Sequence, residues 1–155
     1  MKGLRYAFAL CAVAFMLQTP AYADEAADNS RTEALLHQSG YTYERKTDSV
    51  WVVPQHGKNL GDFKVIVASG GGLDVIFVII AKKAQIPMTL EITGKMLSMN
   101  HEFDRVKVGL DDDGDAFVRD DVSIRAMDDT EMKANIQQVA SSADEIYGKL
   151  KPSLN

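Results

Sequence analysis

The chain has 155 residues, of which 46% are hydrophobic and 25% are charged, and these are values of an ordinary globular domain. Its formal net charge of −5 argues against a nucleic-acid-binding protein, because phosphate contacts need a basic patch. A single cysteine cannot form an internal disulfide or a cysteine-rich zinc site, so the composition predicts one small acidic domain stabilised by packing.

The first 23 residues have the pattern of a secretory signal peptide. Lys2 and Arg5 are basic, residues 6–17 are apolar, and a small–x–small pattern at 21–23 precedes acidic residues. The apolar run would rise only about 18 Å as a helix, which is short of the roughly 30 Å hydrocarbon core of a bilayer. We therefore expect cleavage after Ala23 and a periplasmic protein; the alternative is an uncleaved membrane anchor.

The chain that remains after cleavage should be a self-contained domain. It would have no cysteine, because Cys11 lies in the leader, and this suits an oxidising compartment. Residues 24–29 are polar, and we expect a mobile lead-in there. A capping box predicts that the first helix begins at Ser30, and Gly40 should end it. Residues 30–151 are predicted to form a single domain.

Four segments that follow have strand character. Residues 41–43 mark the first, and residues 50–53 form the second, which Pro54 should stop. Residues 63–67 and 73–81 are the strongest strands.

The strand at 73–81 has a continuous β-branched and aromatic run at 75–80. Such a run predicts a central strand that is covered on both faces. The preceding Ser-Gly-Gly-Gly at 69–72 reads as a hairpin loop. A phosphate cradle would need a following Gly-Lys-Ser/Thr and a helix, and this loop joins two strands.

Residues 87–101 allow more than one interpretation. Their apolar residues fit a helix, although Gly94 and neighbouring threonines weaken it. We predict a helix because the segment is longer than a typical strand and one stripe then contains Leu90, Gly94, Leu97 and His101. Leu90 and Leu97 are candidate partner contacts.

A hairpin is predicted where alternating residues at 106–110 are followed by Asp113-Gly114 and a returning strand at 116–122. Two registers are open. A two-residue turn pairs Leu110 with Phe117, whereas a three-residue loop pairs Val108 with Val118.

The last helix has the strongest signals. Asp128 should cap it, Glu131 should close a capping box, and Met127 and Met132 fit a hydrophobic staple. Pro152 follows its end. One apolar stripe contains Met132, Ile136, Val139, Ala140, Ala143, Ile146, Tyr147 and Leu150.

The order that we predict is α-β-β-β-α-β-β-α, an α+β fold with helices packed on an antiparallel sheet, although four segments before the middle helix have strand character.

The stretches at 96–100, 106–114, 117–119 and 140–147 resemble the YbjN family, whose domain has the fold of type III secretion chaperones. The resemblance implies a non-catalytic protein-interaction domain without a cofactor, often dimeric, that binds another protein or peptide. A secretion signal departs from the cytoplasmic chaperones, so escort of clients in the cytosol is not carried over.

Four carboxylates cluster in the predicted hairpin turn, at Asp111, Asp112, Asp113 and Asp115. Counted from Asp111, glycine falls at position 4 and valine at position 12, whereas an EF-hand loop needs glycine at 6 and glutamate at 12. We therefore expect an acidic surface without a metal. Residues 104–131 contain ten acidic and four basic residues, which favours a basic partner or forms a solvated face that aids solubility.

Catalytic patterns are weak in this sequence. His37, His56 and His101 have no metal-like spacing, and there is no Gly-x-Ser-x-Gly elbow. Trp51, with Val53 on the same segment, is a further candidate contact, because tryptophan is enriched at interaction hot spots; the alternative is burial in the core.

The leading hypothesis is thus an exported protein-binding domain of chaperone-like or regulatory type that is not an enzyme. The alternative is a periplasmic small-molecule or lipid carrier with a cavity between sheet and helices. A third hypothesis, a small hydrolase, would need histidines and carboxylates to converge in a cleft.

Overall fold

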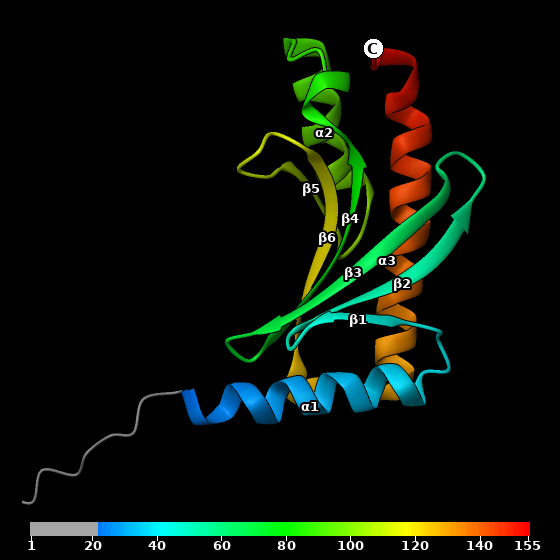
Figure 1. Ribbon diagram of the computed structural model, residues 1–155. Helices are drawn as coiled ribbons and strands as arrows, with labels where there is room; N and C mark the ends of the chain where they lie inside the picture. The colour runs from blue at the N-terminus through cyan, green and yellow to red at the C-terminus, as the bar shows by residue number, and fades with distance from the viewer. Residues whose placement is uncertain (1–21) are drawn as a thin grey trace, which may run out of the picture.

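The computed structural model describes residues 22–155, which form one antiparallel sheet with helices packed against it (Figure 1). In chain order the main elements are α1 (Tyr22–Gln38), β1 (Glu44–Thr47), β2 (Val50–Gly57), β3 (Gly61–Gly70), β4 (Leu73–Ala81), α2 (Leu90–Glu102), β5 (Lys107–Leu110), β6 (Ala116–Ser123) and α3 (Asp129–Leu150). The strand order across the sheet is β1-β2-β3-β4-β6-β5. The α+β class is confirmed, although four strands precede α2 where the predicted order counts three.

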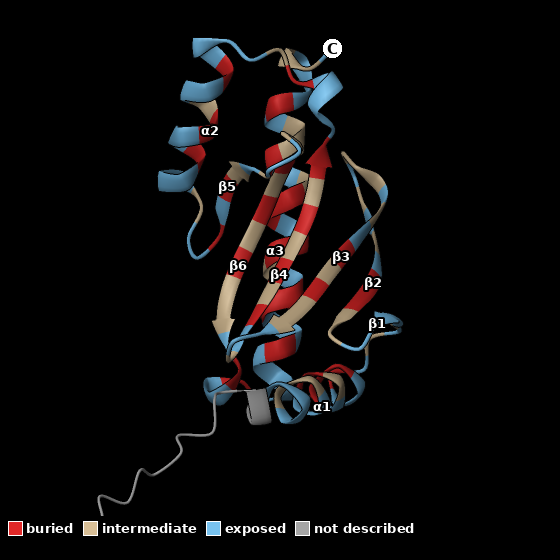
Figure 2. Cartoon of the chain, turned by 60° about the vertical axis from the view of Figure 1, so that its left-hand side comes forward, coloured by how far each residue is buried: buried red, intermediate tan, exposed pale blue. Residues whose placement is uncertain are grey.

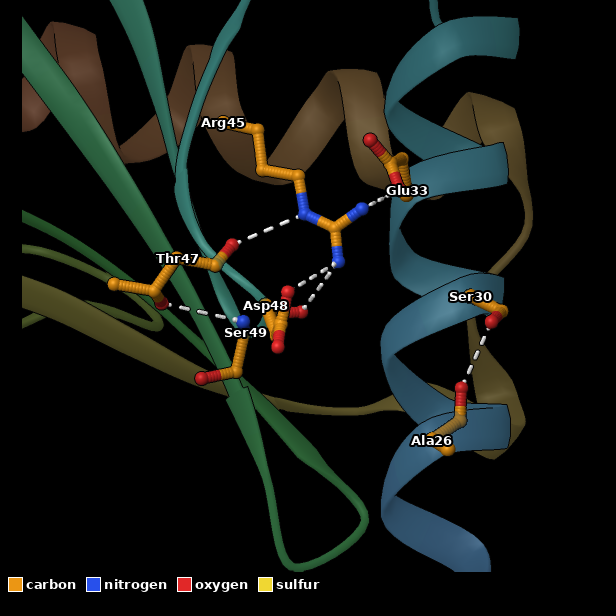
Figure 3. Close-up of polar contacts among 7 residues, drawn as sticks. All are labelled: Ala26, Ser30, Glu33, Arg45, Thr47, Asp48 and Ser49. Atoms are coloured by element: carbon orange, nitrogen blue, oxygen red, sulfur yellow. Dashed lines mark hydrogen bonds and ion pairs between the residues drawn. The ribbon is translucent and has the colours of Figure 1, made fainter.

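Helix α1 begins earlier than predicted. Residues 24–29, expected as a mobile lead-in, are helical, and the Ser30 hydroxyl donates to the Ala26 carbonyl at 2.8 Å (Figure 3). The predicted capping box at Ser30 is therefore wrong, because the hydroxyl bonds back one turn inside the helix. Gly40 has a φ of 81° and follows the end of α1, as predicted. Residues 1–21, with most of the predicted signal peptide, lie outside the described residues.

The first hairpin corrects two predictions. Residues 41–43 precede β1 instead of forming it, and the tyrosines there pack half-buried against the core. Pro54 lies inside β2 and does not stop it. It is tolerated there because β1 pairs with β2 only as far as Val52, so that Pro54 lies on an open edge of the strand, where a missing N–H costs no ladder hydrogen bond.

The remaining hairpins follow their turn chemistry. Gly71 and Gly72 join β3 to β4 with φ values of 61° and 78°. Between β5 and β6 the register pairs Val108 with Val118, so the three-residue-loop alternative is correct. That loop closes with Gly114 at a φ of 85°, which a residue with a side chain rarely adopts.

The two faces of the sheet differ in their cover. The inner face, which α1 and α3 cover, buries alternate residues of the central strands; the outer face presents the others. In β4 the inner residues Ile76, Val78 and Ile80 are buried, whereas the outer residues Val75, Phe77 and Ile79 are half-buried. The prediction that this strand is covered on both faces is therefore wrong. Figure 2 shows β6, β4 and β3 in front of α3, with no helix in front of them.

Helix α3 provides most of the cover of the inner face. Asp128 accepts a hydrogen bond from the Glu131 backbone N–H at 2.8 Å, which confirms the predicted cap. The predicted apolar stripe is also confirmed, since its members are buried apart from Tyr147, which is half-buried. The space between the sheet and α3 is filled by this stripe and by the inner-face side chains.

A polar latch joins α3 to the turn between β2 and β3. The Asp144 carboxylate accepts hydrogen bonds from the backbone N–H groups of Lys58, Asn59 and Leu60 at 3.2, 2.8 and 2.8 Å. Burial acts to raise the pKa of Asp144, but these hydrogen bonds outweigh it and hold the pKa below its usual value. Gly57 is required beside the latch, because a Cβ there would collide with this carboxylate.

Candidate functional site

The outer face contains a hollow of about 740 Å³. Its floor consists of outer-face side chains of β4 and β6, one wall is β5 with the following loop, and α2 contributes one residue. The lining is Val75, Phe77, Ile79, Asn100, residues 106–108 and 110–112, Phe117 and Arg119. An apolar floor with a few polar groups at the margin is the usual composition of a binding pocket.

The floor is shaped by an aromatic ring that lies over the backbone of β5. A Cβ at Gly109 would stand 2.8 Å from the Cζ of the Phe117 ring, so glycine lets this ring approach the strand closely. The Arg119 guanidinium in turn lies 5.3 Å from the centre of the Phe117 ring, a cation–π distance. The Phe117 ring therefore contacts the backbone of β5 at Gly109 and the guanidinium of Arg119.

One end of the hollow is cationic. Lys107 Nζ and Arg119 Nη2 both contact Asp121 Oδ2, at 2.7 and 3.3 Å. Burial acts to raise the pKa of Asp121, but the hydrogen bond from Lys107 and the two positive charges outweigh it and lower that pKa. Two cations share one carboxylate, so this end has an excess of positive charge.

The other end of the hollow is acidic, because Asp111 and Asp112 line it. Within the same loop Asp111 Oδ1 accepts the Asp115 backbone N–H at 2.8 Å, and Asp115 pairs with Lys82 at 2.7 Å. Asp112 and Asp113 are exposed. The four residues of the predicted acidic surface therefore differ. Asp115 is engaged by Lys82, whereas Asp112 is exposed beside the hollow.

Helix α2 closes the edge of β5. The Asn100 amide oxygen accepts the Val108 N–H at 2.7 Å, and its amide nitrogen donates to the Val108 carbonyl at 3.1 Å. One side chain thus occupies the donor and the acceptor that another strand would use. Thr89 caps the helix by accepting from the Ile92 N–H at 3.3 Å.

The predicted stripe on α2 faces solvent. Leu90 and Leu97 are 93% and 66% exposed, and Met88, just before the helix, is 61% exposed. The buried side of the helix instead consists of Ile92, Met96 and Met99. A groove of about 170 Å³ between α2 and β5 connects Leu97 to the hollow through Leu110, which lines both. The exposed side chains of Leu90 and Leu97 are thus accessible to a partner.

The other two candidate contacts belong to the core. Trp51 and Val53 lie on the inner face and have no exposed surface, so they are unavailable to a partner in this conformation. Arg45 lies 6.0 Å from the Trp51 ring. It also donates to the Thr47 carbonyl at 3.1 Å and to Glu33 of α1 at 3.0 Å, which ties α1 to the first hairpin (Figure 3).

A buried carboxyl was missed by the sequence reasoning. Asp74 of β4 is wholly buried beneath α1, and the Thr32 hydroxyl lies 2.8 and 3.0 Å from its two oxygens. Burial raises the pKa of Asp74 to about 6, against the opposing effect of hydrogen bonds from Thr32 and Ser69. The sequence does contain a signal for this burial. Asp74 occupies a position in β4 whose alternate neighbours Ile76, Val78 and Ile80 point inward.

The histidines do not converge. His37 lies on α1, His56 on β2 and His101 on α2. His56 Nδ1 is 2.7 Å from Asp62 Oδ1, but both side chains are exposed. Within residues 22–155, no three His, Cys, Asp or Glu side chains are grouped so that they could hold a metal ion. No helix of the same part of the chain has the length and apolar character that a membrane span requires.

Two solved structures have a similar fold. A chain of the heterodimeric ExoU–SpcU complex from the type III secretion system of Pseudomonas aeruginosa matches with a TM-score of 0.53 and 16% identity, over 79% of this chain and 96% of that chain. A chain of the type III secretion chaperone SycH of Yersinia pestis, in complex with a stable fragment of YscM2, matches with a TM-score of 0.50 and 13% identity, over 77% of this chain and 98% of that chain. The protein therefore has the α+β fold of the secretion chaperones, as the resemblance implied.

Residues 30–152 match the family model YbjN, described as "Putative bacterial sensory transduction regulator". The chain belongs to the YbjN family. No curated protein matches it.

Proposed function

We propose that this chain is an exported, non-enzymatic protein-binding domain of chaperone-like or regulatory type, and that its partner covers the outer face of the sheet. The description of its family as regulators and the chaperone fold support a binding role. The partner is another protein or peptide, and the acidic excess of residues 104–131 favours a basic one.

The observation that carries the proposal is the incomplete cover of the outer face. Phe77, Ile79 and Phe117 are large apolar side chains that remain half-buried around a hollow, and exposed Leu97 continues this surface onto α2. A contiguous apolar surface with charged residues at its margin is typical of a protein interface.

Site-specific photo-crosslinking tests the proposal. We expect a photo-reactive amino acid at Phe77 or Leu97 to form a covalent adduct in cells that express the full chain, and mass spectrometry identifies the attached polypeptide. The same amino acid at Lys133, exposed on α3, is the control. Adducts of equal yield at all three positions, or at Lys133 alone, would contradict binding through the outer face.

Export is tested separately. Cleavage after Ala23 predicts a product that begins at Asp24 and is released by osmotic shock, because the leader pattern at 1–23 directs secretion. Intact-mass measurement of the released protein checks this. Full-length chain retained in the membrane would instead support an anchor.

Two other occupants of the same surface are distinguished by these measurements. A second copy, as expected for a homodimer, would give a crosslinked dimer of this chain and twice the monomer mass by light scattering. A small-molecule or lipid carrier is favoured only by the volume of the hollow, since the space between sheet and helices is filled. Native mass spectrometry would then show a bound small molecule.

A further inference from the structure

We infer that the hollow on the outer face holds an amphipathic helix of another protein, with the acidic first turn of that helix over Lys107 and Arg119 and its basic last turn over Asp111 and Asp112. This inference rests on the proposed function, because it names the chemistry of the partner at the same surface.

The place of the hollow favours a helix over an added strand. A segment that lies on the face of a sheet meets side chains only, so it must satisfy its own backbone hydrogen bonds, and a helix does so. The nearby edge of β5 is closed at Val108, where the Asn100 amide takes both backbone groups. Helix α3 already covers the inner face in the way that a second helix would cover the outer one.

The charges at the two ends of the hollow give the helix a direction. Lys107 and Arg119 share only Asp121, whereas two carboxylates line the opposite end. Residues 107 and 111 lie four positions apart along an extended chain, or about 13 Å. A helix covers that distance in about nine residues.

A specific sequence pattern follows for the partner. An acidic residue at one position should be followed by apolar residues three and four positions later, over Phe77, Ile79 and Phe117, and by a lysine or arginine seven or eight positions later. Acidic residues in the first turn and basic residues in the last turn also complement the helix dipole, so the pattern stabilises the helix that it requires.

A second copy of the chain fits this pattern poorly. Its α2 has an exposed apolar stripe, but the stripe ends at His101, and Lys95 already contacts Glu91 and Ser153. The chain has a formal charge of −5, so two copies repel each other as they approach. A helix with a basic last turn from a different protein meets the acidic end without this repulsion.

The experiment uses the full chain and a labelled, covalently stapled peptide of about four helical turns with the stated pattern. A second peptide has the acidic and basic residues exchanged, and circular dichroism verifies equal helicity. We expect a micromolar Kd for the first peptide by fluorescence anisotropy and binding at least about tenfold weaker for the exchanged one. The variant F77A should weaken binding about tenfold or more, whereas L73A, at an exposed leucine of the same strand outside the hollow, should not.

Charge reversal at one residue tests the direction. The variant D112K should weaken the first peptide several-fold, and a peptide whose last turn is acidic should restore binding to that variant. D113K changes the charge of the neighbouring exposed residue, outside the lining of the hollow, and is the matched control.

Equal binding of both peptides, or no rescue of D112K, would overturn the inference. A dimer of this chain that dissociates in the F77A variant would also overturn it, because a second copy would then occupy the hollow. If neither peptide binds while crosslinking at Phe77 still captures a polypeptide, the inference fails and the proposed function stands. If crosslinking at Phe77 and at Leu97 also gives no adduct, the proposed function fails as well.

Discussion

The inner and outer faces of the sheet are built from the same strands but differ in what covers them. On β4, Ile76, Val78 and Ile80 are buried beneath α3, and the residues between them form the floor of an open hollow. Both sets are β-branched or aromatic, so composition alone does not distinguish them. Apolar residues on the inner face stabilise the fold, whereas those on the outer face are available for binding, and variants on the two faces should separate these roles.

The largest difference is expected at two aromatic residues. The substitution W51A removes a wholly buried ring from the inner face and should cost about 3–5 kcal/mol of stability. F77A on the outer face should cost about 1 kcal/mol, because its ring is only partly buried in the folded protein. Urea unfolding measures the free energy of unfolding of both variants. Equal losses of that free energy would show that the two faces are equally important for stability.

The next effect concerns the carboxyl buried on the inner face. Asp74 has a raised pKa of about 6 in the folded protein and an ordinary value of 3.8 when unfolded. Between these values the unfolded chain releases a proton that the folded chain keeps, so the contribution of Asp74 to stability is lost as the pH rises. Relative to D74N, the natural chain should lose about 2 kcal/mol of stability between pH 4 and pH 7.

Urea unfolding of both chains across that pH range measures this effect. Parallel stability curves for the natural chain and D74N would show that the pKa of Asp74 is not raised.

A smaller effect is expected at the latch that holds α3 over the inner face. D144A removes the acceptor of three backbone N–H groups and should cost about 1–3 kcal/mol. E145A, at the next and exposed residue, should cost about 0.5 kcal/mol or less. Thermal unfolding of the pair measures the difference, and similar losses for the two variants would argue against the latch.

The smallest effect on stability is expected on α2. The double variant L90K/L97K places charges on the exposed stripe and should change the free energy of unfolding by about 0.5 kcal/mol or less. Ile92, on the buried side of the same helix, is the contrast, because I92A should cost at least about 2 kcal/mol. A strong loss of stability in the double variant would place the stripe in the core.

Sequence patterns predicted well those features that depend on a few neighbouring residues. The Asp128 cap, the apolar stripe of α3 and the glycine turns all follow from local geometry, and the structure contains them. The cap at Ser30 failed for a local reason as well, since a serine hydroxyl can bond back to a carbonyl four residues earlier inside a longer helix.

The features that failed depend on which surfaces meet. Helix α2 has two apolar sides, and its packing against β5 and α3 decides that Ile92 is buried and Leu90 exposed. Nor does the run at 75–80 reveal how its two faces differ. A helix covers one face of this strand, whereas no helix of residues 22–155 covers the hollow on the other face. Most of the candidate site was missed for this reason, because Phe77, Phe117 and Arg119 come together only through strand pairing.

Contacts between distant parts of the chain have a consequence for the export that we propose. Arg31 of α1 donates to the carbonyl of Met127, 96 residues later, and Leu36 completes a core that α3 otherwise fills. The first helix thus acquires the last of its partners only after nearly the whole polypeptide has been synthesised. Such long-range closure is slow, which leaves the newly made chain unfolded for longer. If the chain is exported as we propose, this topology favours passage through a translocation channel before folding.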